Sequence, residues 1–348
     1  MKVDELRRIL LKYDQDTTRK LVVEMYKIIP KKVREDTALD EFISTFTSMT
    51  GPVRKTKSEQ DLIIDFDILK SEAVAFIEYA SMSYYYAPNR IVPKTARSKW
   101  RVTARKLLKS LIAVKGENTE EAAQLLIEMY RMLSYACGTF IFSTENPFSA
   151  VGFKQPDLLD IILTKLFSSG VTQETLRLAV FVVLESRVDR ETLHSELMVS
   201  LLRQLKTVDA RELALEECSF FIKSFKDATK RPYKSRRFLL TYDRKGWDID
   251  YSDSVSEDCA ELYLRLSIAL HEYDKGIRFF RKYFRERDPE VNLFCLLMVL
   301  RMYTDSNPTL VEKWIEIYDK AVEAGITPRK KLAEWRTELE DATPISQE

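Results

Sequence analysis

The chain has 348 residues, of which 45% are hydrophobic and 31% charged, with only 8 glycines and 11 prolines. This composition is typical of an ordered, helix-rich protein and excludes a disordered chain or a fold built from many β-hairpins. The formal net charge is only +1, so any attraction for a polyanion has to come from a local cluster of basic residues.

The first two predicted helices cover residues 3–13 and 17–29, and they form either a small cap on the rest of the chain or a separate recognition module. The N-terminus is charged from its first residues and lacks the apolar core of a secretory signal. The longest apolar runs, Leu178–Leu184 and Leu293–Leu300, are far shorter than the roughly 20 residues that span a bilayer. We therefore expect a cytoplasmic protein with no membrane partner.

The segment between Tyr86 and Ser110 holds eight Lys or Arg residues and no acid. A single helix is predicted from Lys94 to Val114, and beside its apolar face four basic residues recur at every fourth position: Arg97, Arg101, Arg105 and Lys109. These side chains would form a stripe about 18 Å long that could follow the phosphates of a nucleic acid, with Tyr84, Tyr85 and Tyr86 as stacking surfaces upstream. The alternative is a solvated face, or one paired with acidic helices of this chain, beside half-buried tyrosines.

The middle of the chain contains helix starts near Asn118, Thr172, Asp189 and Asp209, because each of these side chains can accept hydrogen bonds from the first turn of a helix. Gly170 follows a run of apolar periodicity, which is typical of a left-handed residue just after a helix.

The charge pattern changes abruptly after this region. Residues 230–245 carry seven basic residues and one acid, whereas residues 247–261 carry six acids and no base. This pattern predicts a charged linker or surface loop over residues 230–253. Three of its basic residues are candidates for nucleic-acid binding: Lys234, Arg236 and Arg237. These side chains either extend the nucleic-acid surface or pair with the acidic residues that follow in the chain.

The C-terminal third repeats one helix-starting device at Asp288, Asn307 and Thr327, each of which is followed by proline. The first residue can cap a helix, and proline suits the first turn because that turn needs no backbone N–H from it. Helix starts separated by 17 to 20 residues predict antiparallel helical hairpins of about 37 to 39 residues, stacked as in an α-solenoid.

One of these hairpins has a recognisable pattern. The run from Leu262 to Pro289 carries Tyr273, Gly276 and Phe280 at spacings that resemble a tetratricopeptide repeat, although the first-helix Trp and Gly of that pattern are missing. Gly276 stands where the family usually has alanine. The resemblance covers some 28 residues and implies a helical hairpin of that class and a role in binding another protein.

Signals for catalysis are few. Arg187 with His194 and Arg265 with His271 match the loose Arg-x(4–6)-His pattern of helical ribonucleases of the HEPN type, which implies RNA cleavage without a metal. The common motifs for nucleotide binding, serine hydrolysis and zinc proteolysis are missing. Four separated cysteines and two histidines do not form a metal site or a disulfide framework. We therefore predict no catalytic residue, no metal and no cofactor.

The sequence thus predicts an all-α protein that binds another protein through its surface and has no chemistry of its own. The expected parts are an N-terminal helical region over 1–115, middle hairpins over 116–229, the charged segment 230–253 and a repeat-like region over 254–348. The alternative function is nucleic-acid binding by seven residues: Arg97, Arg101, Arg105, Lys109, Lys234, Arg236 and Arg237. The third hypothesis is the metal-independent ribonuclease.

Overall fold

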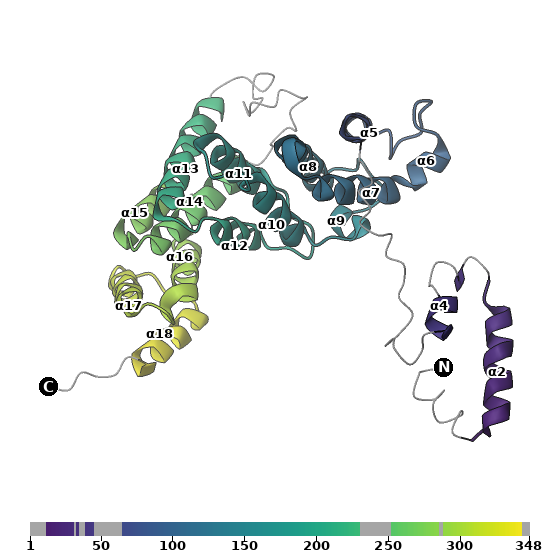
Figure 1. Cartoon of the computed structure of the whole chain (residues 1–348). Helices are drawn as coiled ribbons and strands as arrows, with labels where there is room; N and C mark the ends of the chain where they lie inside the picture. The colour runs from purple at the N-terminus through teal and green to yellow at the C-terminus, as the bar shows by residue number, and fades with distance from the viewer. Residues whose placement is uncertain are drawn as a thin grey trace. The chain divides into compact units, whose positions relative to one another are not determined.

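The structure is a computed structural model of the whole chain, and it describes residues 12–30, 33–34, 39–44, 65–229, 252–284 and 288–342. Within these ranges the residues lie in helices, turns and irregular segments and none lies in a strand, which confirms the predicted all-α class (Figure 1). None of the helices in these ranges combines the length and the apolar character needed to cross a bilayer. Contacts divide the chain into two units, Met1–Ile64 and Asp65–Glu348.

The first unit contains α2 (Gln15–Ile28) and α4 (Leu39–Ser44). The helix α2 starts where it does because the Asp14 carboxylate accepts a hydrogen bond from the Thr17 N–H at 2.9 Å. The Tyr26 hydroxyl donates to the Asp40 carboxylate at 2.7 Å and so links the two helices. This agrees with the predicted helix over 17–29, whereas most of the predicted helix over 3–13 lies outside the described residues.

The second unit begins with a group of helices that pack around α8. They are α5 (Phe66–Ser81), α6 (Lys94–Ser98), α7 (Trp100–Ala113), α8 (Thr119–Ala136) and the short α9 (Pro147–Val151). Both α5 and α7 pack on α8. Trp100, which is buried, stacks on Phe142 with ring centroids 3.9 Å apart and fixes the start of α7.

The prediction of one continuous helix from Lys94 to Val114 is wrong. Lys99 has φ −94° and ψ 3°, a conformation outside the helical range, and it separates α6 from α7. The break allows Trp100 to enter the core. It also removes Arg97 from the row of basic residues on α7, so that the row runs from Arg101 to Lys109 over about 12 Å, and not 18 Å.

The middle helices pack chiefly on their second neighbours along the chain. They are α10 (Gln155–Leu166), α11 (Gln173–Glu185), α12 (His194–Gln204) and α13 (Val208–Thr229). The helices α8, α10 and α12 pack in succession, and α11 packs on α13. Stacked hairpins place second neighbours side by side in this way.

Local capping explains where the middle helices begin. The start after Thr172 is confirmed, since the Thr172 hydroxyl accepts from the Thr175 N–H at 3.2 Å. The start at Asp189 is wrong by several residues: its carboxylate accepts from the Glu191 N–H and closes a turn before α12. The start predicted near Asp209 is confirmed within one residue, since α13 starts at Val208, but the cap is Thr207, whose hydroxyl accepts a hydrogen bond from the Ala210 N–H.

The C-terminal helices are α14 (Ser252–Ala269), α15 (Tyr273–Tyr283), α16 (Pro289–Thr304), α17 (Pro308–Glu323) and α18 (Lys330–Ala342). The starts at Asp288 and Asn307 are confirmed, with each side chain accepting from the first turn. The third helix starts at Lys330, three residues after Thr327. Gly325 after α17 has φ +82°, and Gly170 has φ +108°, the left-handed conformation predicted for Gly170.

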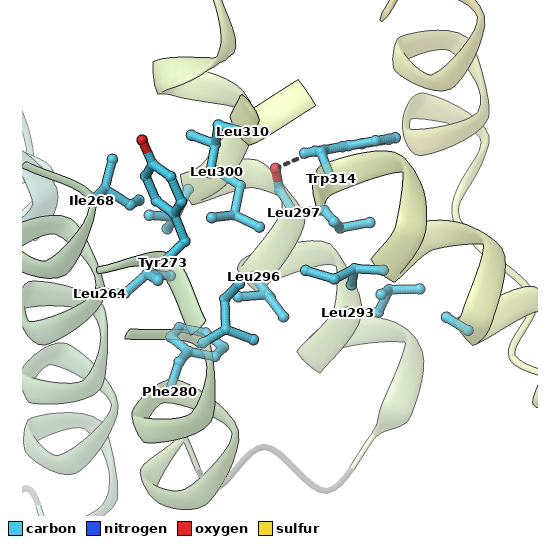
Figure 2. Packing of buried hydrophobic residues seen from close by; sticks show 14 of the residues in the cluster. Leu264, Ile268, Tyr273, Phe280, Leu293, Leu296, Leu297, Leu300, Leu310 and Trp314 are labelled. Carbon is cyan, nitrogen blue, oxygen red and sulfur yellow. Dashed lines mark hydrogen bonds between the residues drawn. The ribbon is translucent and has the colours of Figure 1, made fainter. Parts of the chain in front are cut away.

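A continuous hydrophobic core joins α14, α15, α16 and α17 (Figure 2). Its largest member, Trp314, is completely buried, and its Nε1–H donates to the Leu297 carbonyl oxygen at 2.8 Å. Figure 2 shows Tyr273 and Phe280 of α15 facing the leucines of α16. The hairpin α14–α15 is tightly closed, because a Cβ at Gly276 would lie 2.7 Å from the Cβ of Ser267.

The predicted boundaries at residues 115 and 230–253 stay predictions. The structure packs α7 on α8, on either side of residue 115, and α13 on α14, on either side of the charged segment. Residues 230–251 lie outside the described residues.

Candidate interaction surfaces

Two of the predicted basic residues bind backbone carbonyls of their own unit. Arg105 donates from Nε to the Val151 carbonyl oxygen at 2.9 Å and from Nη2 to that of Ala150 at 3.5 Å, which neutralises the carbonyl end of α9. The Arg97 Nη1 lies 3.4 Å from the carbonyl oxygen of Asn89 and 3.3 Å from that of Val92. Both guanidinium groups are therefore held in place.

The other two basic residues on the stripe face the solvent. Arg101 and Lys109 are exposed, and the Arg101 guanidinium lies over the Trp100 ring at 5.8 Å from its centroid. In the described part of the chain, the one ion pair made by a basic residue between Tyr86 and Ser110 joins Lys106 to Glu72 at 3.6 Å. The structure thus brings Arg101, Arg105 and Lys109 together on one side of α7, whereas Lys234, Arg236 and Arg237 lie outside the described residues.

The three consecutive tyrosines have different environments. Tyr85 packs against Phe76 with centroids 4.8 Å apart, and burial raises the pKa of its hydroxyl to about 12. Tyr84 is half-buried beside Tyr79. Tyr86 is 51% exposed and stacks on Phe140, itself 59% exposed, with centroids 5.8 Å apart and planes inclined by 23°. Only this last tyrosine offers an accessible aromatic face.

A separate groove of about 520 Å³ lies between α10, α12 and the segment that precedes α12. Met302 of α16 closes one side of it. Two of its apolar side chains are unusually exposed for their size: Leu193 at 69% and Met302 at 57%. Apolar side chains grouped beside a groove are a common feature of binding surfaces.

The groove is predominantly acidic. Its charged lining residues are Asp157, Asp189, Glu191 and Glu196 against Lys154 and Arg203, which gives four negative and two positive charges. Two of the carboxylates are fixed by the backbone: Asp189 accepts from the Glu191 N–H and Glu196 accepts from the Leu193 N–H, each at 3.0 Å. The groove therefore presents preorganised negative charge beside apolar side chains.

A buried polar network supports the segment that forms one wall of the groove. The side chain of Gln155, which is completely buried, donates to the Arg187 carbonyl oxygen at 2.9 Å and accepts from the Asp189 N–H at 3.0 Å. The same amide donates to the Tyr130 hydroxyl at 3.1 Å, and the Arg187 N–H donates to the Ser134 hydroxyl at 2.7 Å. Burial raises the pKa of Tyr130, which keeps its hydroxyl neutral. Sequence reasoning missed this network; its only signal was polar residues on apolar helix faces.

The two histidines have partners other than the predicted arginines. His194 Nδ1 lies 3.2 Å from the Asp258 carboxylate. Burial by itself would lower the pKa of His194, but Asp258 and the Val183 carbonyl outweigh it and raise that pKa. Arg187, by contrast, donates from Nη1 to the Thr139 hydroxyl at 2.8 Å.

In the second predicted pair, Arg265 and His271 also contact other residues. His271 Nδ1 lies 2.7 Å from the Tyr273 hydroxyl. Arg265 is completely buried and binds the Glu261 carboxylate and the Tyr303 hydroxyl. In the ranges that the structure describes, no group of three or more His, Cys, Asp or Glu side chains has the geometry to hold a metal ion. The four cysteines are free thiols.

Comparison of the chain with models of known protein families, with curated proteins and with experimentally determined structures finds no match.

Proposed function

We propose that this protein is a protein-interaction module and that its groove beside α10 and α12 receives a short segment of a partner protein. The observation that carries the proposal is the combination of exposed Leu193 and Met302 with fixed carboxylates at one groove. When a partner covers apolar side chains that are exposed in the free protein, their removal from water lowers the free energy of the complex.

The chemistry of the groove defines its occupant. A complementary segment carries one or two apolar side chains to cover Leu193 and Met302, flanked by Lys or Arg residues that meet Asp157 and the fixed carboxylate of Glu196. The volume of about 520 Å³ suits a few side chains and excludes a whole domain. The supporting network around Gln155 keeps the wall in one conformation, so little order has to be created on binding.

A peptide library displayed on phage tests this proposal. We expect selection on the wild-type protein to enrich peptides with a Leu, Met or Phe next to Lys or Arg. In fluorescence anisotropy with a selected peptide, Leu193→Asp and Met302→Asp should each weaken binding at least about tenfold, since each change removes apolar contact and adds a charge. Asp157→Lys should weaken binding of the same peptide and reduce its salt dependence.

Val322→Asp is the matched control, because Val322 is 47% exposed, lies on α17 and does not line the groove. It should bind the peptide as the wild type does. The proposal is overturned if selection enriches no such pattern, or if the selected peptides bind Leu193→Asp and Met302→Asp with unchanged affinity while both variants keep their helical circular dichroism.

A further inference from the structure

The outward side of α7 is strongly basic, and in the described chain Lys106 is the one basic residue of this helix that forms an ion pair, with Glu72. The helix contains no Asp or Glu, and its buried side is formed by Trp100, Ala104, Leu107, Leu108 and Leu111. At 100° per residue, Arg101, Arg105 and Lys109 follow one another along the solvent side, with Lys106 close by. The row is about 12 Å long, a length over which one strand of a duplex carries three or four phosphates.

The segment before α7 carries further basic residues. Arg90, Lys94 and Lys99 are exposed, and within the described chain none of them makes an ion pair. Like charges one helical turn apart repel each other, so the row on α7 is unfavourable without a bound anion. The chain as a whole carries only +1, so this concentration of charge is a local feature.

The basic groups are also held ready for binding. Arg105 is fixed by the carbonyl end of α9, and Arg101 lies over Trp100, which is itself stacked on Phe142. Side chains that are already ordered lose less conformational freedom when they bind a ligand.

An exposed aromatic pair adjoins the N-terminal end of the same helix. Tyr86 and Phe140 stack on each other and are both more than half exposed. Phe140 lies two residues before Phe142 in the chain. Phe142 stacks on Trp100, which is the first residue of α7. An aromatic face beside a basic row suits an unpaired base next to its phosphates.

We propose that this surface binds single-stranded nucleic acid, with phosphates along Arg101, Arg105 and Lys109 and a base stacked on the Tyr86–Phe140 pair. The exposed aromatic rings favour a single strand over a duplex, in which the faces of the bases are covered. This surface shares no residue with the groove, so it is a second binding activity of the chain.

Fluorescence anisotropy with labelled oligouridylate and oligothymidylate of about 12 nucleotides tests the proposal at about 50 and 200 mM salt. Three phosphate contacts on a single strand give a slope near −2, so the affinity should fall roughly 20-fold between these salt concentrations. The variant Arg101→Glu with Lys109→Glu should bind at least about tenfold more weakly, and its slope should be smaller by about 1.4. Both residues are exposed and make no ion pair in the described chain, so the variant should keep its fold.

Lys206→Glu with Lys330→Glu is the charge-matched control, because both lysines are exposed and lie elsewhere. It should bind the oligonucleotides within about twofold of the wild type. Tyr86→Ala tests the base contact: it should weaken oligonucleotide binding at least about fivefold and leave binding of inorganic polyphosphate, which has no bases, unchanged.

The proposal is overturned if the control variant loses as much affinity as Arg101→Glu with Lys109→Glu, or if Tyr86→Ala binds the oligonucleotides as the wild type does. It is also overturned if poly-glutamate binds as tightly as the oligonucleotides, since the surface would then serve an acidic protein. Leu193→Asp should leave oligonucleotide binding unchanged, which separates this test from that of the groove.

Discussion

Replacing Gly276 by alanine should force apart the hairpin formed by α14 and α15. A Cβ at this position would lie 2.7 Å from the Cβ of Ser267 and 3.1 Å from Cδ1 of Leu264. The Cβ of Ser267 is bonded directly to its backbone, so no side-chain rotation relieves the first contact. The two helices have to move apart, and this strains the Tyr263–Phe279 stack, whose centroids are 3.6 Å apart.

The size of the effect follows from opposing contributions. Overpacking a close core contact costs about 1–3 kcal/mol, and a weakened aromatic stack costs up to about 1 kcal/mol more. Alanine in place of glycine inside a helix stabilises the folded protein by about 1 kcal/mol. We therefore expect Gly276→Ala to lower the free energy of unfolding by up to about 3 kcal/mol, as measured by urea denaturation followed by circular dichroism.

A double-mutant cycle isolates the contact. Ser267→Gly alone should cost about 0.5 kcal/mol as a helical glycine, but it removes the Cβ that the methyl group added by Gly276→Ala would meet. In the double variant this methyl group has room, so the two changes should couple favourably by at least about 1 kcal/mol. Ser267→Ala is the control: it keeps the clash, and it should be neutral or stabilising because the Ser267 hydroxyl is buried without a hydrogen bond.

Two results would refute this reasoning. If Gly276→Ala stabilises the protein by about 1 kcal/mol, alanine is accommodated and the helices do not approach as closely as the structure shows. If the coupling with Ser267→Gly is below about 0.5 kcal/mol, the cost arises from some other neighbour.

Three further predictions concern stability. The His194–Asp258 contact raises the pKa of the imidazole, so the contact's contribution to the free energy of unfolding is complete below the ordinary pKa of 6.5 and is lost as the pH rises through the raised pKa. His194→Gln should abolish that part of the pH dependence of the urea midpoint. Burial raises the pKa of Glu185 from 4.5 to about 7 despite Arg131, so the free energy of unfolding should fall as the pH rises across that range and the buried carboxyl group ionises. A Glu185→Gln variant whose free energy of unfolding still falls in this way would contradict the prediction. Trp314→Phe removes the indole N–H that donates to the Leu297 carbonyl oxygen and opens a small cavity, so thermal unfolding should show a free energy of unfolding lower by about 2–4 kcal/mol. A decrease below about 1 kcal/mol would mean that the site closes around the smaller ring.

The sequence predicted those helix starts that depend on a single local cap. Thr172, Asp288 and Asn307 each bind the first turn of the helix that follows, and no nearby residue competes. The prediction failed where the same residue types had another use. Asp189 closes a turn with Glu191, and Thr207 takes the capping position two residues before Asp209. Tertiary packing decides between such local alternatives.

The break at Lys99 could not be predicted, because neither glycine nor proline marks it. Apolar spacing alone extends one helix across it, whereas the stacking of Trp100 on Phe142 places the break. The groove was also beyond sequence reasoning. Its walls come from α10, from α12 with the segment before it, and from Met302, and these parts meet only through the packing of α10 on α12.

The near-zero net charge of the chain conceals surfaces of opposite sign. The groove has four carboxylates and two basic groups, whereas α7 itself carries four basic residues and no acid. Exposed charges act over about 8 Å at physiological ionic strength, so a ligand responds to the cluster that it touches and not to the sum over 348 residues. A basic peptide and a nucleic acid should therefore each bind its own surface, and saturation with one should leave the other still able to bind. Competition between the two would show that a single surface serves both ligands, and one of the two proposed surfaces would then be wrong.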